Sequence, residues 1–240
     1  MLPKSKQSTI LLALLSIIPP ISAVDETHDP ATNAKLLAAA TELDRQKILS
    51  SDTQWIFDFH AQQTYSYSPG SVINANAATF PAMQSTGMTL AMLNLGPCAM
   101  LPPHLHPRAT NVVVAVEGMT TTYMVEENGA RAVTEVLSPG KMTIFPRGSL
   151  HTMQNMGCGN ATLVSALDSS DTGTLNVINQ LANLPNDIVQ AGFGNTAAAQ
   201  FWKNVDKSQI PGVGSGSNLG SADCIAACKS GQKVGAYEGR

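Results

Sequence analysis

The sequence predicts a mainly β protein, a single small β-barrel with helices at both ends. From about residue 72 to residue 166, short apolar runs alternate with Gly, Pro and Asn turn signals roughly every ten residues. This spacing is typical of a β-sandwich or barrel. The flanking segments carry apolar residues at helical spacing instead. With 240 residues, of which 43% are hydrophobic, the chain can form one domain with a full core.

Residues 1–23 are predicted to be a secretory signal peptide. Lys4 and Lys6 precede an apolar run over residues 10–18, and a proline pair and the small residues Ser22 and Ala23 follow it. A basic start, a short apolar stretch and a small-residue cleavage site define such signals. The run is about half of the roughly 20 residues that a membrane span requires. We therefore expect cleavage after Ala23, a secreted, extracellular protein and no stable membrane insertion.

Three further segments are expected after the signal. Residues 24–70 form an N-terminal helical arm, residues 71–185 the β-barrel, and residues 186–240 C-terminal helices, a Gly/Ser linker and a cysteine tail. The arm is predicted to contain one helix, because its apolar residues recur at helical spacing. These residues are Leu36, Leu37, Ala40 and Leu43. In the last segment, "PNDIVQAGF" and "NTAAAQFWKNV" are the candidate helices.

Charge excludes one class of partner. Lys and Arg number 14, Asp and Glu 17, and the formal net charge is −3. A nucleic-acid-binding surface needs a concentration of positive charge that this composition lacks. No nucleic acid is therefore expected as a partner. The chain also has no G-x-S-x-G motif, so a serine-hydrolase arrangement is not indicated.

The four cysteines are expected to form disulfides, because disulfides persist outside the cell. Four cysteines allow three pairings, and sequence alone does not separate them. We predict a bond between Cys224 and Cys228 in "SADCIAACKSG", where no nearby histidine or further cysteine supports a zinc site. Cys98 and Cys158 either pair with each other or remain buried thiols.

Asn160 begins the sequon Asn-Ala-Thr, which marks a glycosylation site if it lies on an exposed turn. A used sequon would make the protein a glycoprotein. The alternative is an unused site.

Three histidines in the β segment are the candidate metal ligands. His104 and His106 are two residues apart, and residues i and i+2 of a strand point to the same face. His151 follows a turn at Pro146 and Gly148 that leads into another strand. An HxH pair alone also suits two polar residues on a strand. Three converging imidazoles could hold Mn, Fe, Cu or Zn.

Two separated motifs carry a resemblance to a known family. The first is "PPHLHPRAT" over residues 102–110, which leads to Glu117-Gly118. The second has the spacing of Gly140, Pro146, Gly148, His151 and Asn155. With the upstream stretch "ATFPAMQSTGMTLAMLNLGP", they make most of the mature chain similar to the germin-like and spherulin-like members of the cupin superfamily.

This resemblance implies a single cupin jelly-roll barrel with a metal inside, in a secreted and often oligomeric protein. His104, His106 and His151 would be the imidazole ligands, and manganese the expected ion, with Fe, Cu or Zn as alternatives. A homo-oligomer is expected, with cyclic symmetry as the simplest form. The family's fourth ligand is a glutamate directly after the "PRAT" segment, and here that position is Asn111. Asn111 is expected to complete the shell through its amide oxygen or to hydrogen-bond a bound water.

The change at Asn111 alters the charge of the expected site. A divalent ion with one glutamate and three neutral histidines has a net charge of +1, whereas asparagine leaves the charge at +2. The low effective dielectric inside a barrel magnifies this difference. We expect weaker metal binding and more Lewis-acid than redox character.

The pocket residues also depart from the resemblance. Two asparagines hold the substrate in the family's oxalate oxidases, and these positions fall on Gln84 and Ala91. Gln84 still offers a side-chain amide, whereas Ala91 offers none, so a classical oxalate oxidase is disfavoured. Met153 and other methionines in the β segment are soft fillers of apolar space, usually in a core. Together they favour a pocket for an apolar or aromatic molecule.

The first hypothesis is a secreted germin-like cupin that binds a divalent metal and acts as a metal-dependent oxidoreductase on a small organic molecule. The alternatives are a non-oxidative biosynthetic enzyme, such as an isomerase, cyclase or dehydratase, or a non-catalytic extracellular binding or wall protein. No side chain is an obvious general base, so no catalytic residue is assigned.

Overall fold

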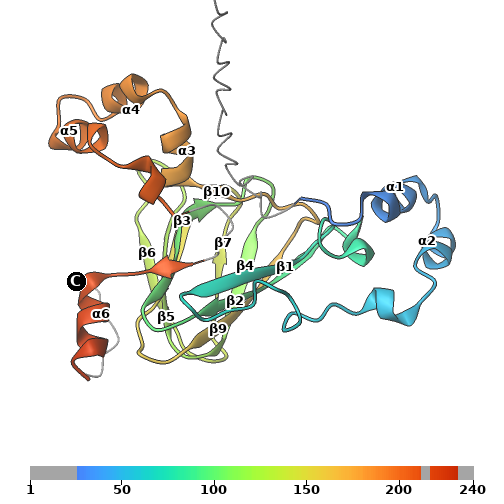
Figure 1. Cartoon of the computed structure of the whole chain (residues 1–240). Helices are drawn as coiled ribbons and strands as arrows, with labels where there is room; N and C mark the ends of the chain where they lie inside the picture. Colours follow the sequence, from blue (N-terminus) through green and yellow to red (C-terminus); the bar gives the residue numbers. More distant parts are fainter. Residues whose placement is uncertain (1–25, 212–216, 232–240) are drawn as a thin grey trace, which may run out of the picture.

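The computed structural model describes residues 26–211 and 217–231. Two antiparallel sheets face each other and form a barrel, with helices at its ends (Figure 1). The predicted β-barrel with flanking helices is confirmed. The predicted signal over residues 1–23 lies outside the described residues. Within those residues, no helix has the length and apolar character needed to cross a membrane.

The first sheet has five strands. In spatial order they are β1 (Gly70–Ala75), β2 (Thr89–Leu95), β9 (Ala161–Leu167), β4 (Asn111–Glu117) and β7 (Met142–Phe145). The second sheet contains β10 (Leu175–Asn176), β3 (Ala99–Leu105), β8 (Leu150–Asn155), β5 (Thr120–Val125) and β6 (Val133–Leu137), and β11 (Asn218–Leu219) also pairs with β3. Several neighbours, such as β2 with β9 and β3 with β8, lie far apart in the sequence. This connectivity is the jelly roll.

The core lies between the two sheets and follows from alternation along the strands. On β2, Ala91, Leu93 and Leu95 are buried at every second position, as expected where one face of a strand packs on the core. Burying a Leu or Val side chain stabilises a fold by about 1.5–3 kcal/mol. Further members of this cluster are Ala99, Leu101, Ala109, Val113, Ala115, Leu137, Phe145, Met153, Ala161, Leu163 and Leu167.

The single helix expected in the N-terminal arm is two short helices, α1 (Pro30–Ala38) and α2 (Glu42–Ile48). The break occurs because Thr41 is extended and caps α2, where its hydroxyl accepts a hydrogen bond from the Asp44 N–H at 3.2 Å. Leu36 is buried, whereas Leu37 and Leu43 are exposed. Two 3₁₀ turns, η1 (Asp52–Trp55) and η2 (Pro81–Met83), complete this region.

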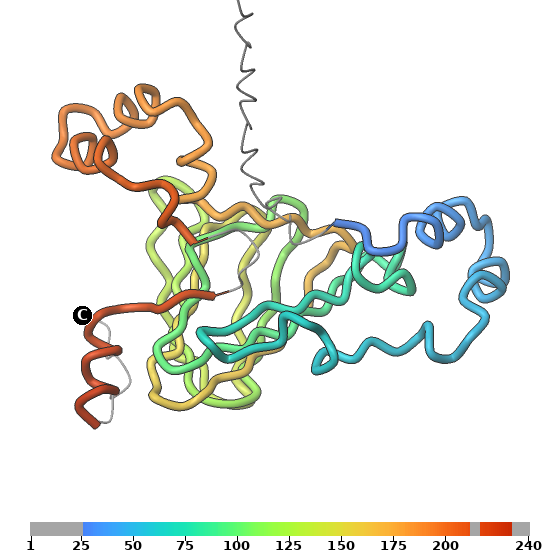
Figure 2. Tube along the Cα trace, in the orientation of Figure 1, coloured from blue at the N-terminus to red at the C-terminus, as the bar shows by residue number. Residues whose placement is uncertain are grey.

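The C-terminal region begins with a helix that periodicity did not indicate, α3 (Val177–Asn183). The two candidate segments form α4 (Asn186–Gly192) and α5 (Ala197–Lys203), which are followed by the turn η3 (Lys207–Gln209). The last helix is α6 (Ala222–Lys229), and Figure 2 shows that it lies apart from α3–α5 along the barrel.

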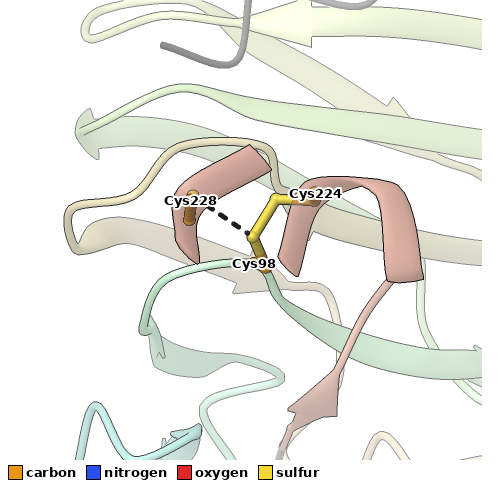
Figure 3. Close-up of side chains that lie close together, drawn as sticks. All are labelled: Cys98, Cys224 and Cys228. Atoms are coloured by element: carbon orange, nitrogen blue, oxygen red, sulfur yellow. Dashed lines mark hydrogen bonds between the residues drawn. A yellow bond between two sulfur atoms is a disulfide. The ribbon is translucent and has the colours of Figure 1, made fainter. Parts of the chain in front are cut away.

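The predicted bond between Cys224 and Cys228 is wrong. The structure pairs Cys98 with Cys224 and Cys158 with Cys228, with Cα–Cα distances of 5.7 and 5.4 Å. Cys224 and Cys228 are one turn apart on α6, so their side chains leave the same face of the helix in parallel. Each reaches a cysteine in a loop of the barrel instead. The three sulfurs of Cys98, Cys224 and Cys228 are close together (Figure 3), and the Cys98 and Cys228 Sγ atoms are 3.6 Å apart.

The two disulfides should stabilise the barrel as well as hold the tail. The bond between Cys98 and Cys224 joins residues separated by 126 positions. A bond that closes so long a loop restricts the unfolded chain strongly, so Cys98→Ser with Cys224→Ser should lower the free energy of unfolding by about 3–5 kcal/mol. Urea denaturation of the double variant and the wild type measures this loss.

Trypsin mapping without reduction is the control for the pairing. The peptides that carry Cys98 and Cys158 should both stay linked to the peptide that carries Cys224 and Cys228. If that last peptide is recovered alone, with an internal disulfide, the pairing described here is contradicted.

Candidate metal centre

Two neighbouring strands bring the three histidines together. His104 lies on β3, His106 follows directly after that strand, and His151 lies on β8. His104 is directly opposite His151 in the antiparallel register. One ligand atom from each imidazole lies within 4.8 Å of the others. The arrangement has the size of a three-histidine metal site.

A hydrogen bond to the backbone orients each imidazole. The Nδ1 atoms of His104, His106 and His151 contact the carbonyl oxygens of Pro102, Gly173 and Ser149 at 2.7, 2.7 and 2.9 Å, respectively. A carbonyl oxygen can only accept, so each Nδ1 carries the hydrogen and each Nε2 keeps a lone pair. Metal-binding histidines are held in the same way, with one ring nitrogen donating to the protein and the other facing the ion.

The surroundings keep two of these imidazoles neutral. Burial, together with the nearby His151 and His106, lowers the pKa of His104 well below its usual 6.5. Burial also lowers the pKa of His151, to about 4. The ring of Phe145 stacks on His151 with centroids 4.2 Å apart and fixes its orientation. Neutral imidazoles are the form that binds a metal.

Asn111 reaches the same pocket from the opposite sheet. It is the first residue of β4, it is buried, and it lines the pocket with His104 and His106. In the pairing of β4 with β7, Asn111 lies opposite Phe145, whose ring stacks on His151.

Two of the four candidate ligands, Asn111 and His151, have a buried atom that lacks a hydrogen-bond partner among the described residues, namely Asn111 Oδ1 and His151 Nε2. Leaving a buried polar atom unpaired costs about 1–3 kcal/mol, so such atoms call for an explanation. Three imidazole nitrogens and an amide oxygen are donors that suit a first-row divalent metal. The residues present therefore fit a metal ion.

The pocket beside the histidines has a volume of about 70 Å³. This exceeds the space that a single water needs several-fold, so it can admit a small organic molecule. Ala91 and Met153 line it, together with the apolar side chains of Val72, Leu93, Leu101 and Leu167. Its polar lining includes Asn74, Ser165, Thr172, Thr174 and Asn176, none of which belongs to the two sequence motifs. Ser165 alone left a signal, as a polar residue between Leu163 and Leu167 on the inward face of its strand.

Gln84 is not a pocket residue, contrary to expectation. It follows the turn η2, and its backbone carbonyl accepts a hydrogen bond from the Arg45 guanidinium at 2.6 Å. This contact ties Gln84 to the N-terminal arm, because Arg45 belongs to α2. Gln84 is not among the residues that line the pocket, which its aligned position alone did not show.

Asn160 is exposed in the loop between β8 and β9. The third residue of its sequon, Thr162, lies on β9, and its hydroxyl is 2.6 Å from the Tyr67 hydroxyl. Glycosylation at Asn160 remains a prediction.

The lowered pKa of His151 predicts that acid destabilises the metal-free protein. Above pH 6.5 the imidazole is neutral in both states. Between pH 6.5 and about 4, the unfolded chain binds a proton that the folded chain does not, so stability falls as the pH falls. The shift in this pKa corresponds to a loss of about 3 kcal/mol at pH 4.

Urea denaturation of the chelator-treated protein at pH 7.5 and 4.5 tests this expectation. A His151→Asn variant is the matched control and should lose less stability between the two pH values. Equal losses in the variant and the wild type would show that His151 is not held neutral by burial.

Comparisons with known proteins agree with the fold and the motifs. Residues 59–199 match the cupin family. Spherulin-1A of Physarum polycephalum is 32% identical over 162 residues, which cover 67% of this chain and 65% of the spherulin. Germin-like protein subfamily 1 member 7 of Arabidopsis thaliana is 35% identical over 108 residues, 44% of this chain and 47% of that protein. The chain thus spans about two thirds of this spherulin and about half of this germin-like protein.

Solved structures show the same fold. A recombinant oxalate oxidase in complex with glycolate superposes with a TM-score of 0.57 at 21% identity, over 64% of this chain and 81% of that one. Oxalate decarboxylase from Bacillus subtilis also has a TM-score of 0.57, at 19% identity, over 68% of this chain and 40% of that one. With the jelly roll, the two motifs and the spherulin and germin-like relatives all in agreement, the chain belongs to the cupin family.

Proposed function

We propose that this protein binds one divalent metal ion through His104, His106 and His151 and acts as a metal-dependent enzyme on a small organic molecule. The observation that supports this most strongly is the set of three Nδ1 contacts to backbone carbonyls, which orient the rings, together with the approach of one ligand atom from each imidazole to within 4.8 Å of the others. Manganese is the ion we propose, in line with the resemblance to germin-like proteins. Asn111 Oδ1 is the proposed fourth protein ligand.

The chemistry is proposed to depend on the ion and not on an acidic or basic side chain. A bound divalent ion supplies Lewis acidity, which polarises a substrate oxygen. Apart from the histidines, the lining side chains within the described residues are all uncharged. Asn111 and the hydroxyl residues can orient a substrate through hydrogen bonds. Leu93, Leu101 and Met153 are apolar walls that limit competing water.

The reaction class has two candidates. The resemblance to germin-like proteins favours an oxidoreductase. The uncharged Asn111 favours a non-oxidative enzyme, such as an isomerase, cyclase or dehydratase, because four neutral ligands leave a higher oxidation state of the metal unstabilised. A non-catalytic binding protein is the outcome if the ion binds and no small molecule is turned over.

The proposal places the protein outside the cell, as a homo-oligomer. The disulfides of Cys98 and Cys158 suit an oxidising compartment. Self-association is supported by exposed apolar side chains on the outer face of β4 and β7, where Val116, Met142 and Ile144 are 55%, 60% and 49% exposed.

Metal content is the first expected outcome. Protein purified from its culture medium without chelators should contain about one divalent ion per chain, because the pocket offers one set of converging donors. His104→Ala with His106→Ala should remove the ion, whereas His60→Ala, at an exposed position, should not. Elemental analysis measures all three. Equal metal content in the wild type and the double variant would refute the site.

The charge at position 111 gives a second expected outcome. Asn111→Glu should raise the affinity for Mn²⁺ by about ten- to a hundredfold, because a carboxylate adds a negative charge beside the ion at low dielectric. Asn111→Gln is the matched control, because the glutamine side chain is as long as that of glutamate and carries no charge. Competition with a chelator of known affinity measures both. If the two variants bind Mn²⁺ equally well, the charge argument is wrong. New oxidation of oxalate by Asn111→Glu would indicate an altered oxidase.

A further inference from the structure

The hydroxyl of Ser165 is an unexplained buried group in the pocket. Ser165 is 1% exposed, and its Oγ has no hydrogen-bond partner among the described residues. It lies on β9 between Leu163 and Leu167, both of which are core residues, and it lines the pocket with the histidines. A buried hydroxyl without a partner destabilises the fold, so its presence points to a ligand.

The neighbours of Ser165 explain why no protein group satisfies it. In the register, Ser165 lies opposite Ala91 on β2 and opposite Val113 on β4. Neither side chain can donate or accept a hydrogen bond. Asn74 on β1, opposite Ala91, lines the pocket from the other side.

The place of Ser165 separates it from the metal ligands. Asn111 lies opposite Leu167, two residues further along β9. Two residues of a strand span about 6–7 Å, so the hydroxyl is about that far along the strand from the row of Asn111. A ligand that binds the metal with one oxygen can therefore present a second group to Ser165.

Charge limits what that second group can be. No Lys or Arg is among the lining residues in the described chain, and Asn74 and Ser165 are neutral. A second carboxylate at this end of the pocket would be desolvated without a partner, which is strongly unfavourable. An uncharged hydroxyl or carbonyl oxygen would be satisfied by the Ser165 hydroxyl.

We propose that Ser165 is a substrate-binding residue that selects small monocarboxylates with a second, uncharged oxygen. The carboxylate binds the metal, and the hydroxyl or carbonyl oxygen hydrogen-bonds Ser165 Oγ. This inference rests on the proposed function, since it requires the ion to hold the carboxylate. It excludes dicarboxylates whose second carboxylate reaches Ser165.

Three probes of similar shape test the selection on the Mn²⁺-loaded protein by calorimetry. They are 4-hydroxybutanoate, pentanoate, in which a methyl group replaces the hydroxyl, and succinate, in which a carboxylate replaces the hydroxymethyl group. The wild type should bind 4-hydroxybutanoate most tightly. Ser165→Ala should weaken that binding by about five- to tenfold and leave pentanoate unchanged. Ser165→Thr keeps the hydroxyl and should restore the preference.

A stability measurement on the metal-free protein gives an independent readout. Removing an unpaired buried hydroxyl should raise the Tm of Ser165→Ala by about 2–4 °C, although the same change weakens ligand binding. A Tm at or below that of the wild type, or equal binding of 4-hydroxybutanoate by wild type and Ser165→Ala, would overturn the inference. A wild type that takes up no Mn²⁺ would instead contradict the proposed function. The Tm comparison would still show whether the Ser165 hydroxyl is buried without a hydrogen-bond partner.

Discussion

The site depends on the hydrogen bonds that hold three imidazoles by their Nδ1 atoms. Two of the acceptors are local, because His104 and His151 each contact the carbonyl two residues earlier in the chain. The third is not local, because His106 reaches Gly173, which is 67 residues away. Gly173 has a φ of +63°, and a Cβ there would lie 2.9 Å from the Arg108 guanidinium. A residue with a side chain would therefore displace the carbonyl that orients His106.

The segment around Gly173 is in turn tied to the turn that follows the histidines, between β3 and β4. The Arg108 guanidinium donates to the backbone and carboxylate oxygens of Asp171 at 2.8 and 2.6 Å, and its backbone N–H donates to the Thr172 carbonyl. Both Arg108 and Asp171 are exposed, so the ion pair itself adds little stability. Its contribution is positional: it keeps the loop after β9 against the chain that carries His106. The "PRAT" arginine thus has a structural reason for its place next to the candidate metal ligands.

Much of the barrel and the histidine cluster could be predicted from the sequence, because both depend on local periodicity. Alternating side chains define strands, and His104 and His106 share a face for the same reason. Where the structure differs from the sequence-based prediction, local capping or contacts between distant parts of the chain are the cause. The helix of the arm breaks at Thr41 because capping competes with apolar periodicity, and Cys224 pairs with Cys98 because α6 packs on a distant loop. Gln84 is absent from the pocket lining, and its backbone carbonyl instead accepts a hydrogen bond from Arg45 of the arm. Ser165 stands out only once its apolar strand neighbours are known.

The central claim is that three Nε2 atoms and Asn111 Oδ1 converge on one ion. Anomalous diffraction from a crystal of the Mn²⁺-loaded protein, recorded at the manganese absorption edge, tests it most directly. One strong peak per chain is expected, within about 2.0–2.4 Å of Nε2 of His104, His106 and His151 and of Asn111 Oδ1. A peak bound elsewhere, or imidazoles that face the ion through Nδ1, would contradict the account.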